Sequence, residues 1–365
     1  MQSRPALAVI AAGGTGGHLF PAQAVSEALA QRGWRIVLAT DHRTRDLTAG
    51  FPAQRQLAIA SATLSGGPMT RARQVLSLLR GFLQARAALA GLKPDVVVGF
   101  GGYPSLPTLL AARILGLKTV IHEQNAVMGR ANRLLAPGVT AVACAFPTLM
   151  KAPPEVRERA VVVGNPVRPA IRALAAAAYE TPAPEGPLHL FVTGGSQGAR
   201  VLSETVPAAV AALPAPLRAR LRVVQQTRPE VLERAAALYR DAGVETELAP
   251  FFADMDQRWL WAHLVVARAG ASTVGEIAVA GRPAILVPLR IALDDDQGQN
   301  ARLLAEAGAA VIAPEADLSA QSLADLIANL LGDGERLARM AAAARAVAIP
   351  DAAERLADLI ERTVG

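Results

Sequence analysis

The sequence predicts an α/β protein made of two doubly wound lobes, each built on a parallel sheet. Short apolar runs alternate with amphipathic segments along the chain, which is the pattern of βαβ units. The alternation restarts after a stretch rich in Pro, Ala and Glu at residues 175–187. The length of 365 residues exceeds one typical core and suffices for two domains. We therefore expect a first lobe over residues 1–165 and a second over 166–350, facing each other across a cleft.

The apolar runs are expected to be strands, with ligands bound in the loops at their carboxyl ends. Those expected in the first lobe are residues 7–12, 35–40, 95–100, 119–122, 141–143 and 161–163. Those expected in the second lobe are residues 188–193, 221–225, 263–267, 284–288 and 309–312.

Composition excludes several classes of protein. Hydrophobic residues make up 52% of the chain and charged residues 19%, which argues for large cores and against disorder. The single cysteine, Cys144, excludes an internal disulfide and a cysteine-based metal site. The apolar run at residues 5–12 leads into glycines, so we interpret it as a buried strand and not a signal sequence. No uninterrupted apolar stretch reaches the roughly 18 residues of a spanning helix, and the protein is expected to be cytoplasmic.

Charge is distributed unevenly along the chain. Residues 1–165 hold 18 Lys and Arg against 7 Asp and Glu, a net +11, whereas the remaining 19 and 24 give the second half −5. No acidic residue lies between Asp46 and Asp95. A basic lobe implies an anionic partner, which is a nucleic acid, a phosphorylated substrate or a membrane surface. Nucleic acid fits least well, because aromatic residues are only 4% and no stacking platform or reader motif is present.

The segment from Arg71 to Leu89 is predicted to be an amphipathic helix. Its apolar residues are flanked by arginines, which is the profile of a helix lying on anionic lipid headgroups. The alternative is a helix that packs on its own sheet. Both interpretations stay open at this stage.

Two glycine-rich loops open the two lobes in the same way. They are Gly13-Gly14-Thr15-Gly16-Gly17-His18 and Gly194-Gly195-Ser196-Gln197-Gly198-Ala199. Neither is GxGxxG or GxxxxGK[ST], which disfavours a nicotinamide dehydrogenase and a P-loop ATPase. Backbone N–H groups at a helix N-terminus can receive a phosphate, although glycines also serve simply to allow a tight turn.

His18 closes the first of these loops, at the start of a predicted helix. The positive end of a helix dipole favours the neutral imidazole, which is the form that a general base requires. We interpret His18 as a candidate base, or else as a structural histidine.

Further polar groups follow other strands of the first lobe. Gly101, Gly102 and Tyr103 form a third glycine-rich turn suited to a phosphate. The run His122-Glu123-Gln124-Asn125 follows the next strand: its amides suit sugar hydroxyls, and Glu123 suits a base or an orienting group, unless the run is a structural network. Arg168, at the end of the lobe, suits a diphosphate or an uracil.

In the second lobe, a loop of small residues precedes an acid. Thr273 lies where a helix N-terminus meets a diphosphate, and Glu276 lies one turn on, where a carboxylate can accept from both hydroxyls of a ribose. The alternative role for Glu276 is to complement the helix dipole. The adjacent acids at residues 294–296 cannot all face one ion, so we expect no metal and no cofactor, and favour Gln297 as a ligand for a sugar hydroxyl.

Taken in order, these motifs resemble one family along nearly the whole chain. They are GGTGGH, GGYPS, HEQN, GNPVR, GGSQGAR, the segment that runs from Arg268 to Glu276 and continues into AVAGRPAILVP, and DDDQGQNA. They are similar to those of the bacterial transferases that convert lipid I to lipid II, the UDP-N-acetylglucosamine:undecaprenyl-pyrophosphoryl-muramoyl-pentapeptide N-acetylglucosaminyltransferases. The resemblance implies two Rossmann-like lobes in the GT-B arrangement and inverting transfer to a C4 hydroxyl. It also implies peripheral attachment to the cytoplasmic face of the membrane, and it leaves other cell-wall synthesis proteins open as partners.

The resemblance also implies site residues. A final helix from Asp351 to Val364 is expected to cross back to the first lobe. Phe252 stands where the family has an aliphatic residue, so only a main-chain contact to uracil is carried over. The acceptor diphosphate is expected at Gly13, Gly14, Gly101, Gly102 and Tyr103. The donor is expected at Thr15, Gly16, Gly17, Asn125, Arg168, Ser196, Phe252, Arg268, Thr273, Glu276 and Gln297.

Three alternative functions make predictions that differ from this expectation. A UDP-sugar 2-epimerase shares the two-lobe design but leaves the basic amphipathic helix and the third glycine turn unexplained. A nucleotide-sugar binding protein or membrane scaffold predicts binding without turnover. A transferase with a soluble acceptor predicts no affinity for liposomes.

Overall fold

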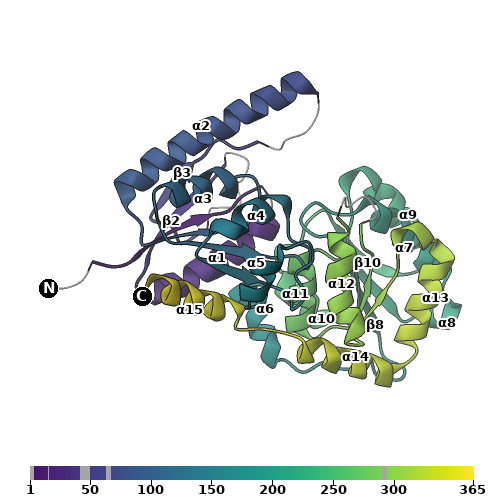
Figure 1. Cartoon of the computed structure of the whole chain (residues 1–365). Helices are drawn as coiled ribbons and strands as arrows, with labels where there is room; N and C mark the ends of the chain where they lie inside the picture. Colours follow the sequence, from purple (N-terminus) through teal and green to yellow (C-terminus); the bar gives the residue numbers. More distant parts are fainter. Residues whose placement is uncertain (1–3, 15, 42–49, 63–66, 290–293) are drawn as a thin grey trace. The chain divides into compact units, whose positions relative to one another are not determined.

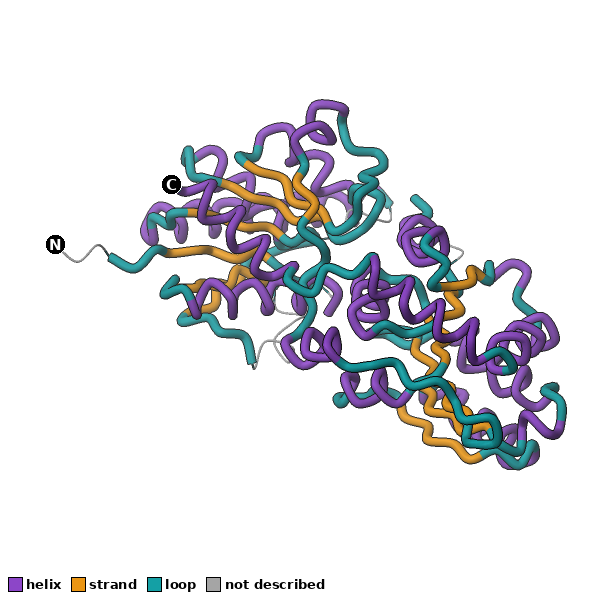
Figure 2. The backbone as a smooth tube through the Cα atoms, turned by 90° about the horizontal axis from the view of Figure 1, so that it is seen from below, coloured by secondary structure: helices purple, strands orange, loops and turns teal. Residues whose placement is uncertain are grey.

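The structure is a computed structural model that describes residues 4–14, 16–41, 50–62, 67–289 and 294–365. The chain divides into two compact units: unit 1 comprises Met1–Arg168 and Pro350–Gly365, and unit 2 comprises Pro169–Ile349. Within each unit a parallel sheet lies between helices (Figures 1 and 2). The predicted α/β class with two doubly wound, Rossmann-like units is confirmed.

Unit 1 is built on a seven-stranded sheet in the order β3-β2-β1-β4-β5-β6-β7, with every pair parallel. The interior strand β1 is buried on both faces: Leu7, Val9 and Ala11 join one core cluster, whereas Ala8 and Ile10 join the other. This explains why the strand is uniformly apolar and does not alternate. The strands are β1 (Leu7–Ala11), β2 (Arg35–Thr40), β3 (Arg55–Ala58), β4 (Val96–Gly99), β5 (Thr119–Glu123), β6 (Ala141–Cys144) and β7 (Val161–Val162).

The helices of unit 1 connect these strands and cover the sheet. The long helix α2 runs along the outside of the unit, beside α3 (Figure 1). They are α1 (Gly16–Gln31), α2 (Pro68–Leu92), α3 (Ser105–Ile114), α4 (Arg130–Leu135), α5 (Pro154–Arg159) and the C-terminal α15 (Ala352–Val364).

Unit 2 repeats the design with a six-stranded parallel sheet in the order β10-β9-β8-β11-β12-β13. Its strands are β8 (Leu188–Thr193), β9 (Leu221–Gln226), β10 (Glu245–Ala249), β11 (Leu264–Ala267), β12 (Ala284–Leu286) and β13 (Ala310–Ile312). Its helices are α6 (Pro169–Ala173), α7 (Arg200–Ala211), α8 (Ala215–Arg218), α9 (Leu232–Asp241), α10 (Met255–Trp261), α11 (Ala271–Ala280), α12 (Asp296–Glu306), α13 (Ala320–Leu331) and α14 (Gly334–Ala346).

Two strands, β3 and β10, were not predicted from the sequence. Both lie at the edge of their sheets, where only one neighbour and partial burial are required. Their sequences, RQLA and ETELA, therefore contain polar residues and lack the apolar run used to find the others.

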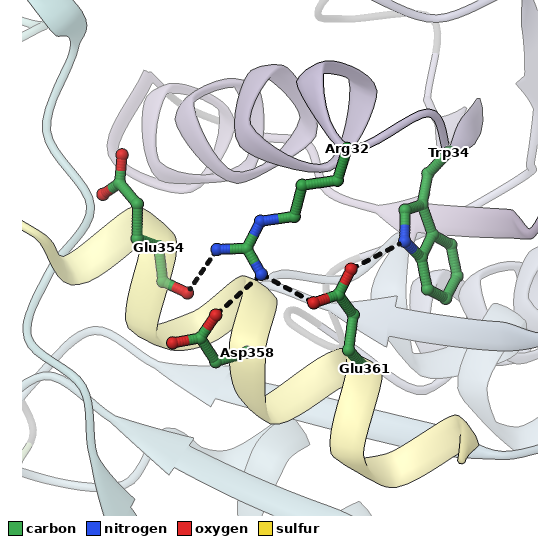
Figure 3. Close-up of polar contacts among 5 residues, drawn as sticks. All are labelled: Arg32, Trp34, Glu354, Asp358 and Glu361. Carbon is green, nitrogen blue, oxygen red and sulfur yellow. Dashed lines mark hydrogen bonds and ion pairs between the residues drawn. The ribbon is translucent and has the colours of Figure 1, made fainter.

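The C-terminal helix α15 packs in unit 1, against α1 (Figure 3). Arg32, just after α1, donates to Asp358 and to Glu361 at 2.7 Å each. The second oxygen of Glu361 accepts from the indole of Trp34 at 3.1 Å. Beneath these polar contacts, Leu356 and Ile360 are buried in the same core cluster as α1. The end of the chain thus completes the core of the unit in which the chain begins.

Candidate functional site

At the carboxyl edge of the sheet in unit 1, glycines bring two loops into contact. A Cβ at Gly13 would lie 2.9 Å from both Pro104 Cγ and Thr40 Oγ1, and one at Gly102 would lie 2.9 Å from the carbonyl oxygen of Gly13. Gly14, Gly101 and Gly102 also have φ between 72° and 90°, a region that other residues rarely adopt. The predicted acceptor residues therefore lie in two adjoining loops, after β1 and β4, with Tyr103 half-buried beside them.

A chain of hydrogen-bonded side chains crosses this edge of the sheet. His18 Nδ1 lies 3.2 Å from Gln124 Oε1, and Gln124 Nε2 donates to the Phe100 carbonyl oxygen at 2.8 Å. The same Nε2 lies 3.3 Å from His122 Nδ1, and His122 Nε2 lies 2.9 Å from the carbonyl oxygen of Gly164. Burial lowers the pKa of His122 to about 4, so its ring is neutral at physiological pH.

Glu123 is buried and fully engaged in local hydrogen bonds. Its Oε1 accepts from the backbone N–H of Asn125 at 3.0 Å, and its Oε2 accepts from the Gly129 N–H and the Asn132 side chain at 2.9 and 2.8 Å. The carboxylate thereby fixes the loop after β5 that carries Asn125. This geometry favours the orienting role of Glu123 over a role as base.

The segment after β7 completes this edge of unit 1. Gly164 has φ 87°, and Arg168 lies with its guanidinium 5.0 Å from the centre of the Phe20 ring, on α1. Phe20 also lies under Gly16, where a Cβ would meet the ring at 2.9 Å. The structure thus brings Arg168 next to the helix that follows the first glycine-rich loop.

In unit 2, the second glycine-rich loop is held by a glutamine from β9. Gln226 Oε1 accepts from Thr193 Oγ1 and from the Gly194 N–H, each at 3.0 Å. Its Nε2 donates to the carbonyl oxygens of Gly195 and Pro250 at 3.0 and 3.1 Å. Ser196 lies exposed on this loop. Gln226 therefore ties the loop to the segment after β10 that leads to Phe252.

The N-terminal end of α11 lies beside this loop. A Cβ at Gly195 would lie 4.0 Å from Thr273 Oγ1. Glu276, one turn on, is 8% exposed and accepts from the indole N–H of Trp259 at 2.9 Å. Trp259 contacts Phe191 edge-on, as Phe252 also does, so the predicted uracil and ribose residues share one aromatic cluster.

Arg268 and Gln297 hold the loop after β12. Arg268 donates to Glu315 at 2.6 Å and to the carbonyl oxygens of Val287 and Pro288 at 3.1 and 3.2 Å. Gln297 Oε1 accepts from the Leu289 N–H at 3.0 Å. In this structure both side chains, predicted as donor ligands, contact the protein itself.

Among the predicted site residues, Thr15 lies outside the described residues. Gly16 and Gly17 form the first turn of α1. Within the described part of the chain, no group of three or more His, Cys, Asp or Glu side chains has the arrangement of a metal site. The only cysteine, Cys144, is buried, and burial raises the pKa of its thiol to about 11, which makes it unreactive.

Sequence reasoning missed Gln226, Trp259 and Glu315, which position other residues. Nothing in their spacing marks them, because each contacts a residue at least 17 positions away. The one available signal is a polar residue at the end of an apolar strand, which applies to Gln226 alone.

With this geometry in place, comparison with known proteins defines the class of the protein. The N-terminal domain of glycosyltransferase family 28 matches residues 8–144 and its C-terminal domain matches residues 189–356, so the chain belongs to glycosyltransferase family 28.

Individual relatives narrow the comparison. The chain is 63% identical, over 98% of both chains, to the UDP-N-acetylglucosamine--N-acetylmuramyl-(pentapeptide) pyrophosphoryl-undecaprenol N-acetylglucosamine transferase of Phenylobacterium zucineum. A crystal structure of MurG from Acinetobacter baumannii is 34% identical, with a TM-score of 0.79 over 98% of this chain and 100% of that one. A putative UDP-N-acetylglucosamine 2-epimerase from Listeria monocytogenes, at 17% identity and a TM-score of 0.70 over 99% and 98%, shares the fold.

Proposed function

We propose that this chain transfers N-acetylglucosamine from UDP-N-acetylglucosamine to the C4 hydroxyl of the muramoyl sugar of undecaprenyl-pyrophosphoryl-muramoyl-pentapeptide, with inversion at the anomeric carbon. The observation that carries the choice of substrates is the 63% identity over 98% of both chains to a transferase of that name. The epimerase alternative rests on likeness of fold alone. The product is the lipid-linked disaccharide precursor of peptidoglycan.

In this proposal His18 is the general base. The acceptor hydroxyl oxygen forms the bond to the anomeric carbon while its proton passes to the imidazole of His18. The bond from the anomeric carbon to UDP breaks, and its electron pair leaves on the diphosphate. A positioned base contributes about 10²–10⁴-fold to such a step. The half-buried ring of His18 lies against Gly101 and Gly102, in the loops we assign to the acceptor diphosphate.

Unit 2 supplies most of the donor contacts in this proposal. The N–H groups of the loop after β8 and of the first turn of α11, with Ser196 and Thr273, receive the diphosphate, and Arg168 adds positive charge. Glu276 accepts from the ribose hydroxyls, and the main chain at Phe252 contacts uracil. The donor contacts that the family resemblance assigns are completed by Thr15, Gly16, Gly17, Asn125, Arg268 and Gln297. A helix N-terminus and an arginine can stabilise a departing diphosphate without a metal.

We further propose that α2 attaches the protein to the surface of an anionic membrane. The helix Met69–Leu92 is long and apolar enough to cross a membrane by length and composition alone, an exception to the expectation that no such segment exists. Yet Arg71, Arg73, Arg80 and Arg86 are exposed along it. The large exposed apolar side chains on the same helix are Met69, Val75, Leu76, Leu79 and Leu83, each more than half exposed.

Such a helix has the composition of one that lies in the plane of the headgroups, because it offers leucines to the acyl region and arginines to the phosphates. Its remaining side packs on unit 1: a Cβ at Gly81 would lie 1.9 Å from the carbonyl oxygen of Ala60. The alternative of a helix that only packs on its own sheet leaves these exposed leucines unexplained.

The transfer is tested by incubating the protein with radiolabelled UDP-N-acetylglucosamine and a short-chain analogue of the lipid acceptor, then separating lipid from UDP. Label in the lipid fraction supports the proposal. Epimerised or hydrolysed sugar with no labelled lipid would contradict it, and UDP binding without any turnover would favour a binding protein.

Membrane attachment is tested by co-sedimentation with vesicles of phosphatidylglycerol and phosphatidylcholine. Replacing Leu76 and Leu79 by Ser is expected to weaken binding at least about tenfold, since burying one leucine contributes about 1.5–3 kcal/mol. Leu260→Ser, at a 49% exposed leucine of unit 2, is the matched control and is expected to bind as the wild type does. Equal binding by all three proteins would argue against α2 as the attachment site.

A further inference from the structure

The orientation of the Gln124 side chain is fixed by its buried surroundings. Gln124 is 2% exposed, and one end of its amide lies 2.8 Å from the carbonyl oxygen of Phe100 and 3.2 Å from that of His122. Carbonyl oxygens only accept hydrogen bonds, so the group facing them must be the NH₂. The opposite arrangement would set oxygen against oxygen inside the protein. The Oε1 atom therefore faces His18.

This orientation determines where the proton of His18 resides. Gln124 Oε1 lies 3.2 Å from His18 Nδ1 and can only accept. A neutral imidazole has one N–H, and the partner of one ring nitrogen decides which nitrogen carries the proton. His18 is therefore protonated on Nδ1, which leaves the lone pair on Nε2.

We propose that Gln124 is a positioning residue that sets the tautomer of His18, so that Nε2 is the atom that receives the proton of the acceptor hydroxyl. This rests on the proposed function and deepens it, because it names the basic atom and the residue that makes it basic. Gln124 contacts neither substrate in this proposal, which replaces our expectation that it binds a sugar hydroxyl.

His122 supports the same arrangement from the other side. Its Nε2 lies 2.9 Å from the Gly164 carbonyl oxygen, which accepts only, so the proton of this ring is on Nε2. Its Nδ1 is then a lone pair, 3.3 Å from Gln124 Nε2, and can accept from the amide. The ring is completely buried, and burial lowers its pKa to about 4. The three side chains thus donate in one direction, from His18 through Gln124 and His122 to the carbonyl oxygen of Gly164.

The glycines of the loop after β4 hold the His18 ring in place. A Cβ at Gly101 would lie 3.4 Å from His18 Cε1, and one at Gly102 would lie 3.3 Å from Cδ2. Both glycines have positive φ, 79° and 72°. The loop therefore lies close to the imidazole and limits its rotation, which keeps Nδ1 towards Gln124.

The tautomer can be read directly by ¹⁵N NMR of protein labelled at histidine, because protonated and unprotonated ring nitrogens resonate far apart. The chain has five histidines, and His18→Gln identifies the signals of His18. We expect His18 of the wild type to be protonated on Nδ1 at neutral pH. A proton found on Nε2 would overturn the proposal outright, whatever the enzyme's substrate.

Two variants of Gln124 separate tautomer control from packing. Gln124→Met keeps the volume and removes the acceptor, so we expect His18 to shift to the Nε2–H tautomer. Gln124→Glu, which the two carbonyls and burial keep protonated, can still donate to Phe100 and accept from His18, and is expected to retain Nδ1–H. Gln225→Met, at a buried glutamine of unit 2, is the matched control and should leave the His18 signals unchanged.

Kinetics of the same variants test the consequence. Gln124→Met is expected to lower kcat at least about 10²-fold, the contribution of a positioned base, while KM for the donor stays within about threefold. Gln124→Glu should recover most of that loss. Unchanged kcat in Gln124→Met, with the tautomer shifted, would show that Nε2 is not the base. A wild-type protein that transfers no sugar would instead contradict the proposed function, and the NMR result would stand by itself.

Discussion

The carboxyl edges of the two sheets are built from different kinds of polar contact. In unit 1, side chains form hydrogen bonds to one another in series, from His122 through Gln124 to His18. In unit 2, side chains bond mainly to backbone: Gln226 holds the glycine-rich loop, and Arg268 holds two carbonyl oxygens while paired with Glu315.

The difference corresponds to two tasks. A series of neutral hydrogen bonds fixes the location of a proton, which is what a base requires. Loops whose backbone is hydrogen-bonded by side chains keep their N–H groups in place before a ligand binds. Binding a diphosphate requires N–H groups placed in this way. We therefore expect changes in the series His122–Gln124–His18 to alter turnover, and changes in the donor loops of unit 2 to alter nucleotide affinity.

His18→Gln is expected to have the largest effect on turnover. We expect kcat to fall about 10²–10⁴-fold through loss of the proposed base, with the dissociation constant of UDP changed less than about threefold. Transfer assays and calorimetry with UDP measure the two quantities. His189→Gln in unit 2 is the control and is expected to keep full activity. A large loss of UDP affinity in His18→Gln would contradict the proposed separation of turnover from nucleotide binding.

Lowering the pH should decrease the free energy of unfolding of unit 1, because His122 is buried in its neutral form. The pKa of His122 is about 4 in the folded chain against its ordinary 6.5, so below pH 6.5 the unfolded chain binds a proton that the folded chain does not. The stabilisation is complete above pH 6.5 and declines as the pH falls towards 4, by at most about 3 kcal/mol.

This decline can be measured by hydrogen exchange of unit 1 peptides at pH 7 and 5, corrected for intrinsic rates. The decline should be smaller in His122→Gln than in the wild type. An unchanged pH dependence in the variant would mean that other groups cause the loss.

Glu276→Gln is expected to lower UDP affinity more than kcat, whereas His18→Gln is expected to lower kcat more than UDP affinity. In our proposal the Glu276 carboxylate accepts from the ribose, so removing its charge is expected to weaken UDP binding by about 1.5–3 kcal/mol, or about 10–150-fold, with a smaller effect on kcat at saturating donor. Glu335→Gln, at an acid of α14 whose side chain is 91% exposed, serves as the control. If Glu276→Gln lowers kcat and leaves UDP affinity intact, the carboxylate does not bind the nucleotide.

Trp259→Phe tests whether the aromatic cluster orients Glu276. The change removes one N–H···O bond of 2.9 Å and keeps most of the packing, so we expect UDP affinity to fall about two- to tenfold. The effect should vanish in the Glu276→Gln background if Trp259 acts through the carboxylate, which a double-mutant cycle measures. An equal effect in both backgrounds would assign it to packing alone.

The sequence predicts those features of the fold and the candidate site that depend on residues near one another in the chain. The sheets, the glycine turns and the position of Glu276 follow from runs and spacings in the sequence. The edge strands β3 and β10 did not, because exposure relaxes the apolar pattern. Contacts such as that of Trp259 with Glu276 depend on side-chain orientations that no spacing records. Gln124 was visible, but its role depends on which end of its amide faces the Phe100 carbonyl.

The smallest expected effect concerns the C-terminal helix, which unit 1 uses and unit 2 does not. Arg32→Ala removes both ion pairs to α15, but the carboxylate partners are 39% and 50% exposed, so solvent screens them and the loss is about 1 kcal/mol or less. Hydrogen exchange of residues 352–364 should quicken slightly at low salt and hardly at all in 1 M salt. Because the buried Leu356 and Ile360 remain, α15 is expected to stay folded on unit 1. Complete exchange of the helix in Arg32→Ala would show that the ion pairs, and not the apolar contacts, hold the end of the chain in place.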